Sequence, residues 1–96
     1  MLHLIFQSPP HKATLQRIGK NDAVLFLENS LIHLLKNSAC SFDISAMLAA
    51  HSLFVLVADI ETRGIKPEEL VSGITVIDYA AWVVLTTEHQ PIQSWF

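Results

Sequence analysis

Four short and almost uninterrupted apolar runs constrain the fold of this 96-residue sequence more than any other feature. They span residues 2–6, 24–27, 53–58 and 74–77. A strand that is apolar at every position, rather than at alternate positions, is typical of a sheet that is covered on both faces. Such sheets are mostly parallel and are flanked by helices. The runs therefore predict strands of an open, mostly parallel sheet.

The segments between these runs place apolar residues at helical spacing. We expect short helices over 13–18 and around 31–35, a helix around 44–48 behind a capping Asp43, and a last long helix that starts at Tyr79 and that Pro91 must end or follow. Arg63-Gly64 indicates the end of one more helix, and Pro67 the start of a short one. The alternating order predicts an α/β fold in which only a tail follows the last helix, and the length predicts one domain over 1–96.

Charge and hydrophobicity narrow the classes of partner. Lysine and arginine number 6 against 9 acidic residues, and no cations are clustered, so we expect no direct contact with nucleic acid. The run 53–58 is shorter than the roughly 20 residues of a membrane span, and the start lacks the features of a signal peptide. We expect a cytoplasmic protein. With 51% hydrophobic residues, it has apolar surface to bury in a rich core or against a partner.

Polar residues stand where the predicted strands end, at the edge where open α/β sheets bind ligands. These strand-end positions are Ser8, Glu28, Asp59 and Asp78. A small-ligand binding module that uses these carboxylates would prefer cationic or hydroxylated ligands. Helix N-capping is the other interpretation of Asp59 and Asp78.

Cys40 is the one weak candidate for catalytic chemistry, and it lies in the polar segment "KNSACSFD". It could serve a small thiol carrier, or it could be a packed cysteine without chemical consequence. A single cysteine excludes an intrachain disulfide and a cysteine zinc site. Because the histidines also lack helical ligand spacing, we expect no metal and no other cofactor.

Several short stretches, in order along the chain, carry a family resemblance. They are "MLH" with "SP" soon after, "NDAVLFLE", "ADIETRG", "IDY" and the closing Trp95. As an ordered set, the sequence resembles the TusB/DsrH family over nearly its whole length. The resemblance implies a DsrE-like three-layer α/β/α sandwich with a mostly parallel sheet of four to five strands.

The resemblance also implies a non-catalytic or structural subunit of a sulfur-relay complex. TusC-like and TusD-like subunits would complete a heterohexamer that exchanges persulfide sulfur with TusA-like and TusE-like carriers, for 2-thiolation of the wobble uridine of tRNA. A DsrH-like role in dissimilatory sulfur oxidation is the alternative. DsrH members can carry a cysteine after the first strand. Residues 7–20 contain none, which favours the Tus branch and argues against a persulfide on Cys40.

Large aromatic residues at the end of the chain indicate where partners would bind. We expect Tyr79, Trp82, Trp95 and Phe96 to contribute to a partner interface, since each buried aromatic contributes about 150–250 Å². Packing of Trp95 within its own chain is the alternative. Without partners, the isolated chain could self-associate.

Overall fold

One parallel sheet organises residues 1–7, 12–19, 22–49 and 51–96, the part of the chain that the computed structural model describes. Its strand order is β4-β3-β2-β1-β5, and every neighbouring pair is parallel. The parallel sheet predicted from the apolar runs is confirmed. The strands are β1 Leu2–Ile5, β2 Ala23–Phe26, β3 Ser52–Leu56, β4 Thr75–Ile77 and β5 Ile92–Trp95.

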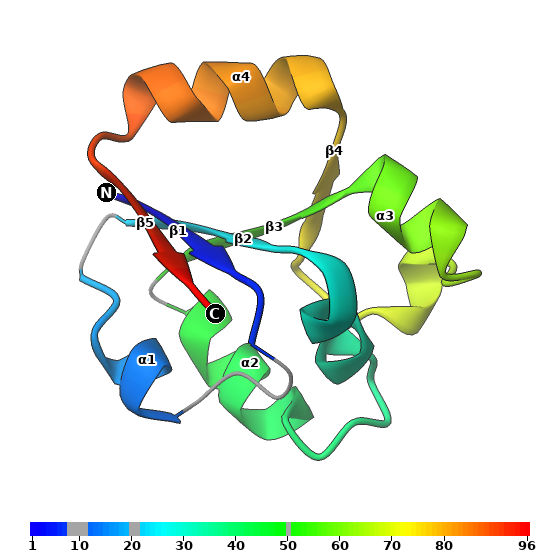
Figure 1. The fold of residues 1–96 in the computed structure, drawn as a ribbon. Helices are drawn as coiled ribbons and strands as arrows, with labels where there is room; N and C mark the ends of the chain where they lie inside the picture. Colours follow the sequence, from blue (N-terminus) through cyan, green and yellow to red (C-terminus); the bar gives the residue numbers. More distant parts are fainter. Residues whose placement is uncertain (8–11, 20–21, 50) are drawn as a thin grey trace.

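Helices lie on both faces of this sheet, with α4 on one face and α1 and α2 on the other (Figure 1). The three-layer α/β/α arrangement implied by the resemblance is confirmed. The α-helices are α1 Lys12–Gln16, α2 Ser41–Leu48, α3 Val57–Thr62 and α4 Tyr79–Glu88, and the 3-10 helices are η1 Glu28–Leu34 and η2 Pro67–Glu69.

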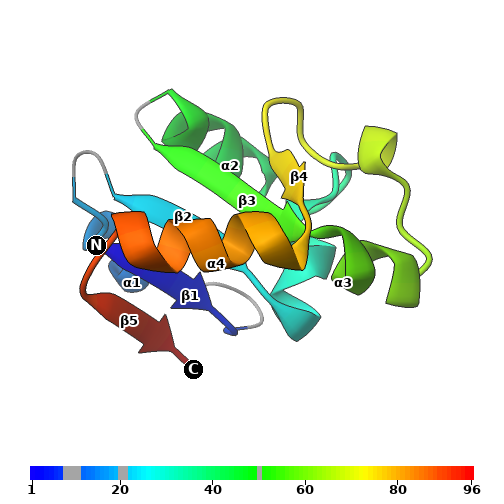
Figure 2. The ribbon, with the colours of Figure 1, turned by 90° about the horizontal axis from the view of Figure 1, so that it is seen from above.

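The order of the connections separates α4 from the other described helices. From β1 to β4, each connection leads to the next strand of the sheet in the same direction. Helix α4 then runs back over the sheet and leads to β5, which lies beside β1 (Figure 2). Right-handed crossovers that run in opposite directions lie on opposite faces of a parallel sheet. A single described helix is therefore left to cover one face of five strands.

The apolar core consists of two clusters, one on each face of the sheet. In the central strand β2, Val24 and Phe26 belong to the first cluster, on the side of α1 and α2. Ala23 and Leu25 belong to the second cluster, to which α4 contributes the buried Leu85. Because side chains alternate along a strand, burial on both faces requires apolar residues at every position, as the runs showed.

The predicted strand 53–58 is wrong at its carboxyl end. Strand β3 ends at Leu56, and Val57 already begins helix α3. The apolar run continues across this boundary because α3 also packs on the sheet and buries Ile60 in the first cluster. The helix end expected at Arg63-Gly64 is confirmed, with Gly64 at a φ of +67°. The helix expected around 31–35 is largely the 3-10 helix η1.

The tail after Pro91 was predicted to contain no regular element, and this was also wrong. Residues 92–95 form β5, which pairs with β1 so that Leu2 faces Ile92 and Ile5 faces Trp95. Its sequence, "IQSW", is half polar because this edge strand is largely exposed. Unlike β4, the strand at the other edge of the sheet, β5 lacks the continuous apolar run that identified the other four strands.

Candidate interaction surface

The strand-end carboxylates serve local structure or face solvent. Asp78 caps α4, because its Oδ1 accepts a hydrogen bond of 2.9 Å from the Ala81 N–H. Asp59 lies inside the first turn of α3, so its expected role as an N-cap is wrong. Glu28 is exposed at the start of η1, and Ser8 lies outside the described residues. The described residues do not gather these groups into a binding site, and they contain no cluster of three potential metal ligands.

Cys40 occupies the N-cap position of α2, and Asp43 lies within the first turn instead of capping the helix as predicted. The thiol is half-buried, and the residue packs against the first cluster. A cysteine held this way is commonly inert packing. Cys40 therefore has a packing role, and the described residues assemble no catalytic partner beside it.

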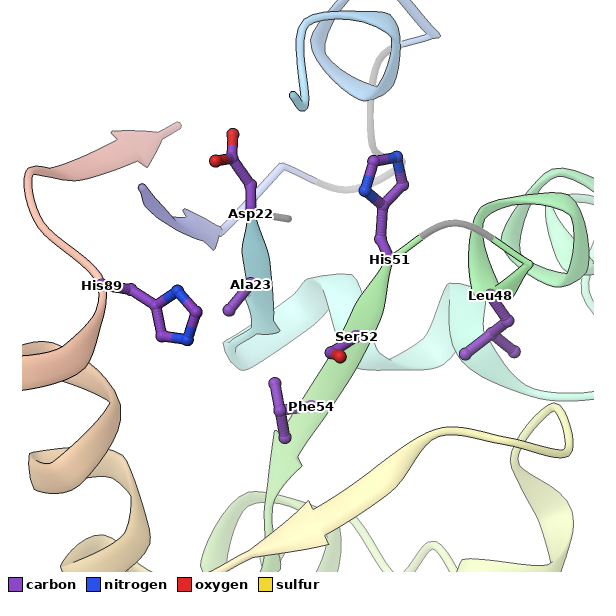
Figure 3. Close-up of a pocket in the computed structure, with 7 residues that line it drawn as sticks. All are labelled: Asp22, Ala23, Leu48, His51, Ser52, Phe54 and His89. Atoms are coloured by element: carbon purple, nitrogen blue, oxygen red, sulfur yellow. The ribbon is translucent and has the colours of Figure 1, made fainter. Parts of the chain in front are cut away.

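A hollow of about 400 Å³ lies at the amino ends of β2 and β3, away from the strand-end carboxylates. Figure 3 shows His51 at the start of β3 and His89 after α4 contributing to its wall, with Asp22 above β2. The Nδ1 atom of His51 is buried and has no hydrogen-bond partner in the described part of the chain. The only carboxylate among the residues drawn is Asp22, and its oxygens have partners within the protein.

Asp22 contacts three surrounding groups within the protein. Its Oδ2 lies 2.8 Å from His3 Nε2 and accepts a 2.9 Å hydrogen bond from the Gly19 N–H, while Oδ1 lies 3.1 Å from the Met1 amino group. Burial raises the pKa of Asp22. The hydrogen bonds from His3, the amino group and Gly19, together with the positive charge of the amino group, outweigh burial and lower the pKa to about 2. The carboxylate is therefore ionised at neutral pH.

Helix α4 is apolar on its outer side as well as on its inner side. Leu85 is buried against the sheet, whereas Tyr79, Val83 and Val84 are 59%, 61% and 51% exposed. A helix that is hydrophobic all round is normally buried on all sides. Large exposed apolar patches mark sites of protein or membrane interaction. The outer side of α4 is therefore the strongest candidate for a binding surface.

Three of the four predicted interface residues lie, together with a fourth aromatic residue, on the sheet face that α4 covers. The Tyr79 and Trp82 rings lie 5.8 Å apart. Trp82 and Phe6 both pack against the second cluster, and the Phe6 and Phe96 rings stack at 4.8 Å with an angle of 11°. We call Tyr79, Trp82, Phe6 and Phe96 the aromatic row. Phe6 was missed at the sequence level, because it appeared only as the end of a predicted strand.

Trp95 points away from the aromatic row. It packs against the first cluster, on the opposite face of the sheet, and its Nε1 donates a 3.0 Å hydrogen bond to His3 Nδ1. The two rings also stack, with centroids 6.3 Å apart. The alternative that Trp95 packs within its own chain therefore has direct structural support, although the indole is only partly buried.

Comparison with known protein families gives one match that spans most of the chain. The family described as DsrH like protein matches residues 6–92. The chain is 33% identical to the protein TusB of Pectobacterium parmentieri and 35% identical to the protein TusB of Yersinia enterocolitica. Each alignment covers 99% of this chain and 100% of the relative.

A solved structure with low sequence identity has the same fold. The structure titled protein of unknown function MTH1491, from Methanobacterium thermoautotrophicum, superposes with a TM-score of 0.81. It is 13% identical in sequence, and the match covers 98% of this chain and 96% of that chain.

Among the described residues, no helix is both long enough and apolar enough to cross a membrane.

Proposed function

This chain belongs to the DsrH-like protein family, and on that premise we propose that it is a non-catalytic subunit of a TusBCD-like sulfur-relay complex. The complex acts in the cytoplasm and passes persulfide sulfur towards 2-thiolation of the wobble uridine of tRNA. The chain's partners are TusC-like and TusD-like subunits in a heterohexamer. TusA-like and TusE-like carriers deliver and receive the sulfur.

The observation that carries this proposal is the exposed apolar side of α4. Tyr79, Val83 and Val84 form it, and the aromatic row extends it towards β5. Permanent complexes have hydrophobic interfaces that resemble a domain core cut in half. An apolar helix over an otherwise thinly covered sheet face is suited to such an interface.

The residues with reactive side chains support a structural role over a catalytic one. Cys40 is half-buried at a helix cap, and Asp22 is occupied by His3, Gly19 and the Met1 amino group. The few cations are scattered along the sequence, which fits a subunit that leaves tRNA binding to other proteins. The sulfur-carrying thiol is then expected on a sister subunit.

Co-expression with TusC-like and TusD-like proteins tests this function. We expect the three chains to purify together at a fixed ratio, and the isolated chain to self-associate. Cys40→Ser should change neither the assembly nor the rate of persulfide transfer to a TusE-like acceptor, because the thiol contributes only packing. Assembly is measured by native mass spectrometry, and transfer with radioactive sulfur.

Two outcomes would contradict the proposal. One is a monomer that stays soluble alone and purifies without the sister chains. The other is a loss of sulfur transfer on Cys40→Ser in a complex that still assembles. The second outcome would favour a thiol carrier that uses Cys40.

A further inference from the structure

On the sheet face opposite the aromatic row, a chain of side-chain hydrogen bonds joins Trp95 in β5, His3 in β1 and Asp22, which precedes β2. His3, in β1, is only 2% exposed. Its Nε2 lies 2.8 Å from Asp22 Oδ2, and its Nδ1 accepts the 3.0 Å hydrogen bond from Trp95 Nε1. Both ring nitrogens of a buried histidine are therefore occupied, one by a residue that precedes β2 and the other by a residue of β5.

This arrangement determines which nitrogen of His3 carries the proton. An indole N–H is a donor only, so Nδ1 must be the unprotonated acceptor. A neutral imidazole then carries its hydrogen on Nε2, where the ionised Asp22 accepts it. The donors point one way, from Trp95 to His3 and from His3 to Asp22. The carboxylate thus selects the one tautomer that can bind the indole.

Strand β5 has few other attachments. It is an edge strand of four residues that pairs only with β1 among the described strands. The backbone hydrogen bonds from Leu2 to Pro91 and from Phe6 to Trp95 mark the two ends of this pairing. Phe96 follows directly after Trp95 and is 83% exposed as a residue, although its ring stacks on Phe6. Phe96 is held directly by this ring contact and by a 3.4 Å hydrogen bond that Gln7 Nε2 donates to its carbonyl oxygen, and indirectly by Trp95, the residue before it.

We propose that His3 is a positioning residue that holds the Trp95 indole and so fixes β5 and the place of Phe96 in the aromatic row. Asp22 orients the imidazole, and the imidazole in turn orients the indole. The binding role of the row rests on the proposed function, but the seating of β5 by His3 does not.

Two substitutions at His3 separate positioning from simple space filling. His3→Leu fills a similar volume but can neither accept from Trp95 nor donate to Asp22. His3→Gln restores both functions, because its amide has a carbonyl acceptor and an N–H donor. Nuclear magnetic resonance on the full chain measures how fast the Trp95 indole proton exchanges with solvent, and it detects the nuclear Overhauser contacts between the Phe6 and Phe96 rings. Trp82→Phe assigns the two indole signals.

We expect His3→Leu to speed exchange of the Trp95 indole proton at least about fivefold, the factor for loss of one hydrogen bond. The Phe6–Phe96 contacts should weaken with it, and His3→Gln should bring both close to wild type. Unchanged exchange and ring contacts in His3→Leu would overturn the proposal. If His3→Leu does not fold, Trp95→Phe removes the indole donor together with part of the ring and leaves His3 and Asp22 unchanged. Loss of the Phe6–Phe96 contacts in Trp95→Phe then supports the proposal, and their retention overturns it.

Binding to the co-expressed sister subunits separates the two levels of inference. If the hydrogen bonds from Trp95 to His3 and from His3 to Asp22 are needed for assembly, His3→Leu weakens binding roughly fivefold or more, and His3→Gln restores it. If the indole is released in His3→Leu while binding stays at the wild-type level, a role of these hydrogen bonds in assembly is contradicted and the proposed function stands. If wild type binds no sister subunit, the proposed function fails, and the exchange rate and the ring contacts alone decide whether His3 positions Trp95.

Discussion

Val83→Glu should weaken binding to the sister subunits at least about 100-fold while leaving the fold of the chain intact. Val83 is 61% exposed on the outer side of α4, so a glutamate there remains hydrated in the free chain. In the complex, the same carboxylate would be buried without a partner, and an unpaired charge in an interface costs about 3–5 kcal/mol. Titration calorimetry or surface plasmon resonance on the purified chains measures the change.

Gln16→Glu provides a matched control for this charge. Gln16 is exposed on α1, which lies on the opposite face of the sheet from α4 (Figure 1). The substitution changes the net charge by the same amount, so a general electrostatic effect would appear in both variants. We expect Gln16→Glu to bind as wild type does. Equal affinities for the two variants would contradict an interface on α4.

Phe26→Ala should lower the free energy of unfolding by about 3–5 kcal/mol, the range for truncation of a buried aromatic. Phe26 is fully buried in β2, between β1 and β3, where it belongs to the first cluster. This loss is a large part of the about 5–15 kcal/mol that stabilises an ordinary domain. Urea unfolding, followed by circular dichroism at low protein concentration, measures it.

Phe42→Ala makes the same chemical change at an exposed position. Phe42 is 82% exposed near the start of α2, so its truncation should shift the unfolding free energy by no more than about 0.5 kcal/mol. A large gap between the two variants is expected because burial, and not the loss of a phenyl ring, determines the cost. Similar losses in both would show that β2 is not at the centre of the core.

Strands β1, β2 and β3 could be predicted because burial on both faces leaves a continuous apolar run, and the edge strand β4 could be predicted because its run 74–77 is also largely apolar. In β2, Ala23 to Phe26 alternate between the two clusters, and so every position is apolar. Strand β5 could not be found in this way. It is an edge strand whose pairing with β1 joins residues about 90 positions apart, and no local pattern encodes such a contact.

The candidate surface was predicted in part for the same reason. Tyr79 and Trp82 are one turn apart on a helix, so their proximity follows from sequence alone. The contribution of Phe6 depends on the pairing of β1 with β5, which brings it against Phe96. Trp95 and Phe96 were grouped together, yet successive residues along a strand point to opposite faces. Recognising β5 would have separated them.

The strand-end carboxylates show a different limit on what can be predicted from the sequence. The sequence correctly places Asp78 before a helix, since the apolar helical pattern begins directly after it. At Asp59, the apolar run crosses from β3 into α3 without a break, and the helix begins two residues earlier than the carboxylate. Hydrophobicity reports burial, and burial does not distinguish the end of a strand from the start of a packed helix.

Hydrogen–deuterium exchange on the chain alone and in its co-purified complex tests the central claim most directly. If the outer side of α4 and the aromatic row form the subunit interface, residues 79–88 and 92–96 should exchange more slowly in the complex. Residues 12–16 and 41–48, on the opposite face, should change little. Protection of α1 and α2 with no change in α4 would contradict the claim.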